Sequence, residues 1–210
     1  VTLSGTVLSV LLMTLCAYPL SKPKMPFKKG VLVYFLICMM FSGGMAPKIL
    51  WMSALGLTGS PLALILPSLI NVFNLLLIKG FFEGLPAELE ESAKLDGANN
   101  YQILFSIVVP MALPMIVTVS MFTAISYWNN FYNALMYLTE SKTWHPIPMY
   151  IKNFFSLSQK DLTYSDTKAA DYLENIKMAL ILASIIPIAI VYPFTLKFFT
   201  KGVAVGSVKG

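Results

Sequence analysis

Charged residues divide this chain into long apolar stretches. Five stretches contain no Asp, Glu, Lys or Arg: 1–21, 30–47, 49–78, 97–139 and 178–196. A Lys or Asp at the centre of a bilayer costs roughly 2.5–3.5 kcal/mol, while each Leu, Ile, Phe or Val offsets only about 0.3–0.6 kcal/mol. Each stretch is long enough to cross a hydrocarbon core of about 30 Å. The pattern predicts five membrane-spanning helices, near 2–20, 31–47, 61–79, 103–127 and 173–197.

The third and fourth stretches are longer than one span, so they must include irregular segments. Gly56, Gly59 and Pro61 are expected to break the third stretch before its helix begins, and Pro110 and Pro114 to interrupt the fourth. The composition agrees with a membrane protein, because 57% of the residues are hydrophobic, 12% are charged and the mean hydropathy is +0.72. We therefore expect one all-α, polytopic transmembrane domain.

The lysines orient this domain, which we take to cover residues 1–210. The loop 21–30 carries four lysines and no acid, and the chain end 197–210 carries three lysines and no acid. By the positive-inside rule both belong in the cytoplasm. With five spans, the N-terminus is then external, the loop 80–102 is internal and the loop 128–172 is external. The net charge of +5 follows from this placement and implies no nucleic-acid partner.

The first residues and the cysteines add two expectations. Val1 begins almost inside a span, without an initiator methionine, a basic leader or a cleavage site. We therefore expect the sequence to start partway through a longer protein, with an earlier helix missing. Cys16 and Cys38 both fall within predicted spans, where small apolar packing residues are expected rather than a redox or metal site.

The segment 86–97 contrasts with the apolar stretches around it. Pro86 suits a first helical position, acids fill the first turns where the helix dipole favours them, and Gly97 suits a left-handed helix end. Glu90 and Lys94 are four residues apart and are expected to form an ion pair. The predicted helix is too short and too charged to span a membrane.

Two interpretations fit a charged helix at the membrane surface. An amphipathic connector lying among lipid headgroups would favour lysines on its polar face, because the cytoplasmic leaflet is negative. The loop 79–102 instead holds five acids and two lysines, so the negatively charged leaflet would repel this loop. The excess of acid favours a docked protein partner that presents basic residues.

At this helix the chain resembles a known family, the permease subunits of binding-protein-dependent type I ABC importers. The similarity is to their "EAA" signature, with Ser92 replacing the first alanine and Val109 replacing the usual leucine. The residues that carry it are Glu91-Ser92-Ala93-Lys94-Leu95-Asp96-Gly97-Ala98, Ile107 and Val109-Pro110. The resemblance covers essentially the whole chain.

The surroundings of the signature look like the carbohydrate branch of that family. They are Leu85-Pro86-Ala87-Glu88-Leu89-Glu90, Ala17-Tyr18-Pro19-Leu20-Ser21, Trp128-Asn129 and the ending from Lys201 to Gly210. The closing stretch from Tyr192 is most similar to permeases that import oligosaccharides and polysaccharides such as alginate or pectin fragments.

The resemblance implies that 86–97 is a cytoplasmic coupling helix docked in a cleft of an ATPase subunit. Glu91 would pair with a basic residue of the ATPase, and the small residues Ala93 and Gly97 would let the helix seat closely. The implied coupling positions are Leu89, Glu91, Ser92, Ala93, Leu95, Asp96 and Gly97.

The C-terminal tail, 198–210, is the second implied contact with the ATPases. The residues concerned are Gly206, Ser207, Val208 and Lys209. A basic chain end held near anionic lipid is the alternative.

The resemblance also implies an assembly in the inner membrane of a bacterium. Its other members would be two cytoplasmic ATPase subunits, a second homologous permease and an external solute-binding protein. This sequence contains no phosphate loop, metal cluster or nucleophile–base set. We therefore expect a non-catalytic subunit without a cofactor of its own, with ATP and Mg bound by the ATPase subunits.

Five residues are candidates for a substrate pathway. Trp128, Asn129 and Asn130 combine an aromatic ring with amides, which suits a sugar's apolar face and hydroxyls, although tryptophan also anchors ordinary helices at membrane interfaces. Asn71 and Asn74 share one face of the third span, where they either line a cavity or form hydrogen bonds between helices.

The external loop 128–172 is long enough to form a platform for the solute-binding protein. Its His145 lies between Trp144 and Pro146 without a companion ligand, so no metal is expected there.

Two other classes of protein fit the sequence less well. A secondary transporter or channel would need ionisable residues at mid-membrane, and the five stretches contain none. A membrane enzyme acting on sugars would need paired acids near the external surface, but the acidic cluster at 80–102 is placed in the cytoplasm.

Overall fold

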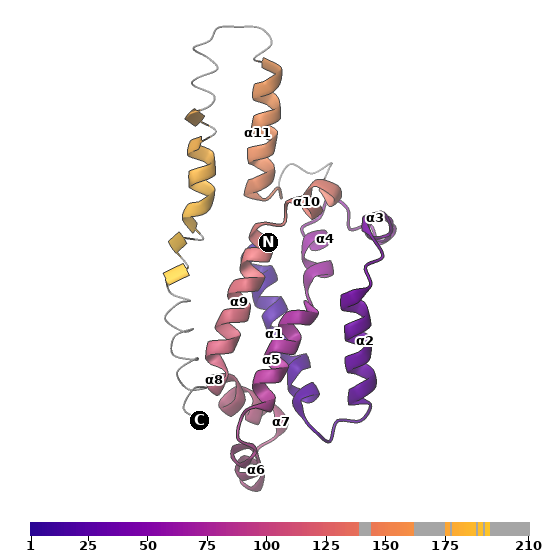
Figure 1. The fold of residues 1–210 in the computed structure, drawn as a ribbon, viewed down its shortest axis with the longest axis vertical. Coiled ribbons are helices and arrows are strands. Elements are labelled where there is room, and N and C mark those ends of the chain that lie inside the picture. Colours follow the sequence, from indigo (N-terminus) through magenta and orange to yellow (C-terminus); the bar gives the residue numbers. More distant parts are fainter. Residues whose placement is uncertain (139–143, 162–174, 177, 188, 191, 194–210) are drawn as a thin grey trace.

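The computed structural model describes residues 1–138, 144–161, 175–176, 178–187, 189–190 and 192–193 (Figure 1). Every regular element in this part of the chain is a helix. Three helices form the centre: α1 (Thr2–Ser21), α5 (Val72–Glu83) and α9 (Leu113–Trp128). α1 packs against both of the others, and α5 also contacts α9. The all-α fold expected from the sequence is confirmed.

The core between these helices is apolar and closely packed. Met13 and Ala17 of α1, Leu75 and Ile78 of α5, and Val119 of α9 are all fully buried in one cluster. Close packing of this kind holds helices together inside a membrane, because moving an apolar side chain from lipid to a helix contact gains no hydrophobic free energy.

α1 confirms the first predicted span. It has 20 residues and, within the described residues, is the one helix long and apolar enough to cross a membrane without a bend. At 1.5 Å per residue it is about 30 Å long, which equals the thickness of a typical hydrocarbon core.

The second predicted span, 31–47, is wrong at its C-terminal end. α2 (Lys28–Met40) stops early, and α3 (Met45–Ala54) continues after a bend of 110°. Gly43 and Gly44 separate the two helices, and Gly44 has a φ of +81°. Glycine is a poor helix former and takes this left-handed conformation without steric cost, so the chain turns here.

The third predicted span, 61–79, is broken as well. Gly56 and Gly59 have positive φ angles and the helix starts after Pro61, as expected. However, α4 (Leu62–Ile65) and the 3-10 turn η1 (Leu66–Ser68) meet α5 at an angle of 48°. Hydropathy does not predict this break, where Asn71 caps the new helix.

The fourth predicted span, 103–127, bends where its prolines lie, as expected. α7 (Asn100–Ile103), the π-helical segment η2 (Leu104–Val108) and α8 (Val109–Met111) form one arm. α9 follows at 82°. Pro110 and Pro114 lack the N–H that a continuing helix would need.

The remaining predictions lie partly outside the described residues. Of the fifth predicted span, 173–197, the structure describes an apolar helix at Met178–Pro187. The loop predicted to be external contains α10 (Phe131–Tyr137) and α11 (Ile147–Asp161), and the tail 198–210 is not described. Within the described residues there are up to four spans, if each bent helix pair counts as one.

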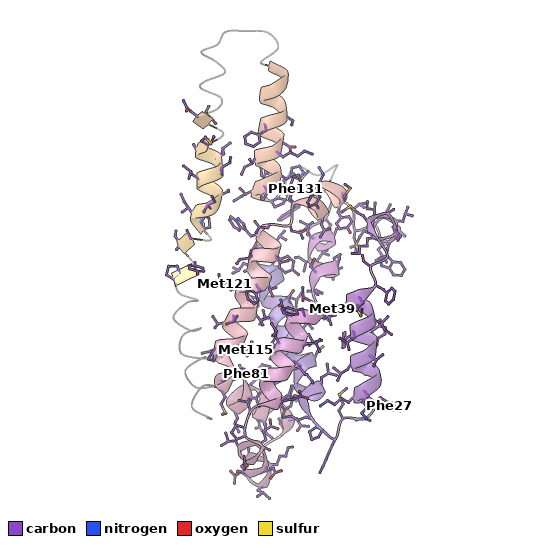
Figure 2. All side chains as sticks on the ribbon, viewed as in Figure 1. Phe27, Met39, Phe81, Met115, Met121 and Phe131 are labelled. Atoms are coloured by element: carbon purple, nitrogen blue, oxygen red, sulfur yellow. The ribbon has the colours of Figure 1, made fainter. Side chains whose placement is uncertain are left out.

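The exterior of the bundle is apolar over much of its surface. α2 has no buried residue, and Figure 2 shows its side chains extending around the helix, with Phe27 at its start. Phe27 is 88% exposed. Exposed apolar surface of this extent suits lipid or another membrane subunit.

Candidate functional site

The charged helix α6 (Ala87–Leu95) forms the tip of one end of the bundle (Figure 1). The connection between α1 and α2 lies at the same end, whereas α3 and α10 lie at the other. The lysine-rich loop 21–30 and the acidic loop 80–102 therefore share one side, as the predicted orientation requires. Pro86 is the residue before the helix rather than its first residue, a shift of one position.

The C-terminal end of α6 is fixed by its backbone. Gly97 has a φ of +84°; its N–H donates to Lys94 O at 3.1 Å, and the N–H of Ala98 donates to Ala93 O at 2.9 Å. This is the hydrogen-bond pattern of a Schellman motif, which confirms the expected left-handed end. Asn99 then caps α7 through a reciprocal pair of bonds with Gln102. The turn from α6 to α7 is thus tightly constrained.

An ion pair ties α6 to the end of α1. Lys22 Nζ donates to both carboxylate oxygens of Glu90, and the side chains of Lys22 and Glu90 are only 27% and 13% exposed. The Lys22 ammonium also lies 4.3 Å from the ring centroid of Tyr18. The predicted pairing of Glu90 with Lys94 is therefore wrong, because the end of α1 brings a lysine against Glu90 on the inner side of α6.

A second ionic cluster lies beside this pair. Lys28 Nζ donates to Glu83 Oε1 at 2.9 Å, and Lys79 Nζ is 2.7 Å from Glu83 Oε2. Because Lys28 begins α2 and Glu83 ends α5, this cluster joins α2 to α5, just before the chain enters α6.

The predicted coupling residues divide between two faces of α6. Ala93 is buried in the chain's own core, so its small size allows α6 to sit against the bundle. Glu91 is exposed and makes no side-chain hydrogen bond or ion pair with any described residue. Leu95 is 90% exposed. The other predicted positions are also exposed: Leu89 and Ser92 in α6, and Asp96 and Gly97 directly after it.

The two asparagines of the predicted substrate pathway have structural partners. Asn74 is buried, and its Nδ2 donates to Thr123 Oγ1 of α9 at 3.3 Å. The side chain of Asn71 caps α5 by accepting from Asn74 N at 3.1 Å. Asn74 therefore forms the expected hydrogen bond between helices, whereas Asn71 caps its own helix.

The other predicted pathway residues lie at the end opposite α6. Trp128 lines a cavity of about 220 Å³ together with Tyr127, Trp144 and His145. Asn129 and Asn130 form the turn between α9 and α10, and Asn129 is exposed. The structure thus places a second tryptophan, Trp144, at the cavity that Trp128 lines.

A buried polar contact of Tyr127, which lines this cavity, was not predicted from the sequence. The hydroxyl of Tyr127 donates to Ile65 O at 3.1 Å and is 2.9 Å from Ser9 Oγ. It thereby satisfies a carbonyl near the break between η1 and α5. The ring lies against Gly5, where a Cβ atom would be 2.9 Å from Tyr127 Cζ. A tyrosine near a helix end offered no signal for this role, because its partners come from distant parts of the chain.

Known proteins with similar sequences include transport permeases. The chain is 43% identical to the polygalacturonan/rhamnogalacturonan transport system permease protein YtcP of Bacillus subtilis (strain 168), over all of this chain and 74% of that protein. It is 41% identical to protein LplC of the same organism, over all of this chain and 72% of that protein.

A solved structure has the same fold. It is the crystal structure of a bacterial ABC transporter involved in the import of the acidic polysaccharide alginate. The TM-score is 0.84 at 33% sequence identity, over 94% of this chain and 71% of that one.

The family follows from the match over nearly the whole sequence. Residues 4–205 match the family described as binding-protein-dependent transport system inner membrane component. A secondary transporter or channel is not favoured by this match. The chain belongs to this family and is a multi-pass permease of the inner membrane.

Proposed function

We propose that this chain is the non-catalytic permease subunit of an ATP-driven importer that moves an oligosaccharide or polysaccharide by alternating access. YtcP and the alginate importer support the substrate class, since both are named for acting on polysaccharides and both align with most of this chain. α6 would couple the permease to ATPase subunits on the cytoplasmic side.

The observation that carries the coupling role is the division of α6 into two faces. Its inner face is held by Ala93 in the core and by the Glu90–Lys22 pair. Its outer face presents Glu91 and Leu95, a carboxylate and an apolar side chain without partners among the described residues. A helix held firmly on one side and exposed on the other can transmit movement of a docked protein to the bundle.

The proposed assembly has the composition that the resemblance implies. Two ATPase subunits would bind ATP and Mg and dock on α6 and on the tail 198–210. A second homologous permease would complete the membrane pathway, and a solute-binding protein would dock at the end that carries α10 and α11. This chain would need no cofactor of its own.

Charge reversal at Glu91 tests the coupling role. Glu91→Lys should weaken ATPase association by about 3 kcal/mol, roughly a hundredfold or more, because it leaves a basic partner facing a like charge. Sugar uptake and co-purification of the ATPase should fall, while membrane insertion stays normal.

Glu88→Lys is the matched control, because Glu88 is an exposed acid on the same helix with the same change in charge. Equal losses in both variants, or normal uptake by Glu91→Lys, would contradict a specific role for Glu91.

The sugar pathway is tested at the aromatic cavity. Trp128→Ala should raise the substrate concentration needed for half-maximal uptake, because packing of the sugar's apolar face on the indole ring is lost, while ATPase association is unchanged. Trp51→Ala is the control, since Trp51 is an exposed tryptophan on α3 that does not line the cavity. Equal effects of the two substitutions would show that Trp128 acts only as an interface anchor.

A further inference from the structure

A cavity of about 500 Å³ opens at the α6 end of the bundle, between the end of α1, the α1–α2 connection, α6 and α7. Three lysines line it, Lys22, Lys24 and Lys94, and no carboxylate is among its described lining residues. Lys22 is neutralised by Glu90. Lys24 and Lys94 are exposed and have no ion-pair partner among the described residues. The cavity therefore holds two uncompensated positive charges.

The rest of the lining determines what kind of anion fits. Leu15, Met25 and Leu104 form apolar wall beside the lysines, and Tyr101 adds an aromatic ring with a hydroxyl. A free phosphate ion would leave this apolar wall in contact with water. A phospholipid would cover it with the first carbons of its acyl chains while its phosphate meets the lysines. The combined lining favours an anionic phospholipid.

The depth of the cavity agrees with this ligand. α1 matches the hydrocarbon core in length, so Lys22 and Lys24, one and three residues after its end, lie near the level of the phosphates. The lysine-rich loop marks this as the cytoplasmic side, where the leaflet is negatively charged. Basic pockets between transmembrane helices on that side are typical binding sites for lipid headgroups.

We propose that this cavity binds the phosphate headgroup of an anionic phospholipid of the cytoplasmic leaflet, with Lys24 and Lys94 as its charged contacts. Lys94 belongs to α6, and Lys24 belongs to the α1–α2 connection. The bound headgroup therefore bridges α6 and the α1–α2 connection, beside the Lys22–Glu90 pair that joins α6 to the end of α1. Lipid at this site stabilises the seat of α6, which makes coupling sensitive to the lipid composition of the membrane. The site does not depend on which sugar is transported.

The test compares two lysines that differ in their relation to the cavity. Lys24 lines it, whereas Lys29, at the start of α2, is equally charged and exposed but does not. The assembled transporter is reconstituted into nanodiscs of phosphatidylcholine with increasing phosphatidylglycerol, and bound phosphatidylglycerol is counted by native mass spectrometry. Lys24→Gln should lower the affinity roughly fivefold, the factor that corresponds to about 1 kcal/mol per lysine near the surface. Lys29→Gln should leave it near the wild-type value.

Lys94→Gln should reduce lipid binding as Lys24→Gln does, which guards against a local effect on the α1–α2 connection. Equal losses in the Lys24 and Lys29 variants would show a general attraction to the leaflet and overturn the site. Wild-type affinity for phosphatidylglycerol in both Lys24→Gln and Lys94→Gln would also overturn the site.

A second arm separates lipid from other sources of negative charge. In detergent, inorganic phosphate at increasing concentration should fail to displace bound phosphatidylglycerol, because phosphate does not cover the apolar wall. Displacement at low concentration would assign the cavity to a soluble phosphate. Carbodiimide treatment of the assembled transporter should not link Lys24 to an ATPase carboxylate. Such a cross-link would show that the ATPase covers the cavity and overturn the lipid site.

Discussion

At the α6 end of the bundle ion pairs join the helices, whereas near the opposite end buried neutral hydrogen bonds join them. Lys22–Glu90 and Lys28–Glu83 join the helices at the first end. The hydroxyl of Tyr127 joins three segments at the second. Ionic contacts near water are weakened by salt and can exchange partners, while a buried hydrogen bond costs its full desolvation when broken. The difference suits an end that moves with a docked ATPase and an end that holds its shape around a cavity.

The largest expected effect comes from breaking the ionic tie of α6. Glu90→Lys would place two ammonium groups together in a partly enclosed site, and Lys22→Glu would do the same with carboxylates. Each single variant should lose most of its coupled transport, because the contact between α6 and α1 is destabilised by a few kcal/mol. The double variant, Lys22→Glu with Glu90→Lys, should recover a large part of the uptake because it restores an ion pair. Uptake in membrane vesicles measures both.

Failure of the double variant to rescue, with normal amounts of protein in the membrane, would mean that the pair does not act as a tie. Lys29→Glu offers a control for the general effect of reversing a lysine in this region, since Lys29 is exposed and has no partner among the described residues.

The next effect probes the opposite end. Tyr127→Phe keeps the ring but removes the hydroxyl, which leaves the Ile65 carbonyl without its donor. Leaving a buried polar group unsatisfied costs about 1–3 kcal/mol. The thermal stability of the purified transporter should fall, and this loss should not depend on salt. Tyr132→Phe is the control, because Tyr132 is 70% exposed. A loss of thermal stability in Tyr127→Phe that depends on salt would contradict the proposed difference between the two ends.

The two ends also differ in how much of them could be predicted from the sequence. The uncharged stretches located the helices, and the proline, glycine and acid pattern located α6 and its left-handed end at Gly97. These are local properties, decided by residues close together in the chain. Lys22 was counted only as a loop charge, because nothing local indicates that α1 delivers it to Glu90, 68 residues away. For the same reason the expected local partner, Lys94, was wrong.

Breaks inside spans were predicted unevenly. Prolines in the fourth span remove backbone donors, so its bend could be foreseen. The turn at Gly43 and Gly44 and the break before Asn71 lie in equally apolar sequence, and hydropathy does not distinguish a helix from a turn there. Likewise the signature pointed to Ala93 as a contact position, but only the fold shows that this residue faces its own bundle.

The smallest expected effect compares two glycines. At Gly5 a Cβ atom would come within 2.9–3.1 Å of three Tyr127 ring atoms, so Gly5→Ala should force the ring away and disturb its hydrogen bonds. Overpacking of this kind costs about 1–3 kcal/mol, with the low end expected because only one methyl group is added. At Gly80 of α5 nothing lies within 4 Å, and Gly80→Ala should be neutral or stabilise the helix by roughly 0.5–1 kcal/mol. Opposite shifts in melting temperature are therefore expected for the same chemical change. Equal shifts would mean that the ring of Tyr127 moves aside at little cost. The Tyr127 end of the bundle would then be as adaptable as the end that carries α6.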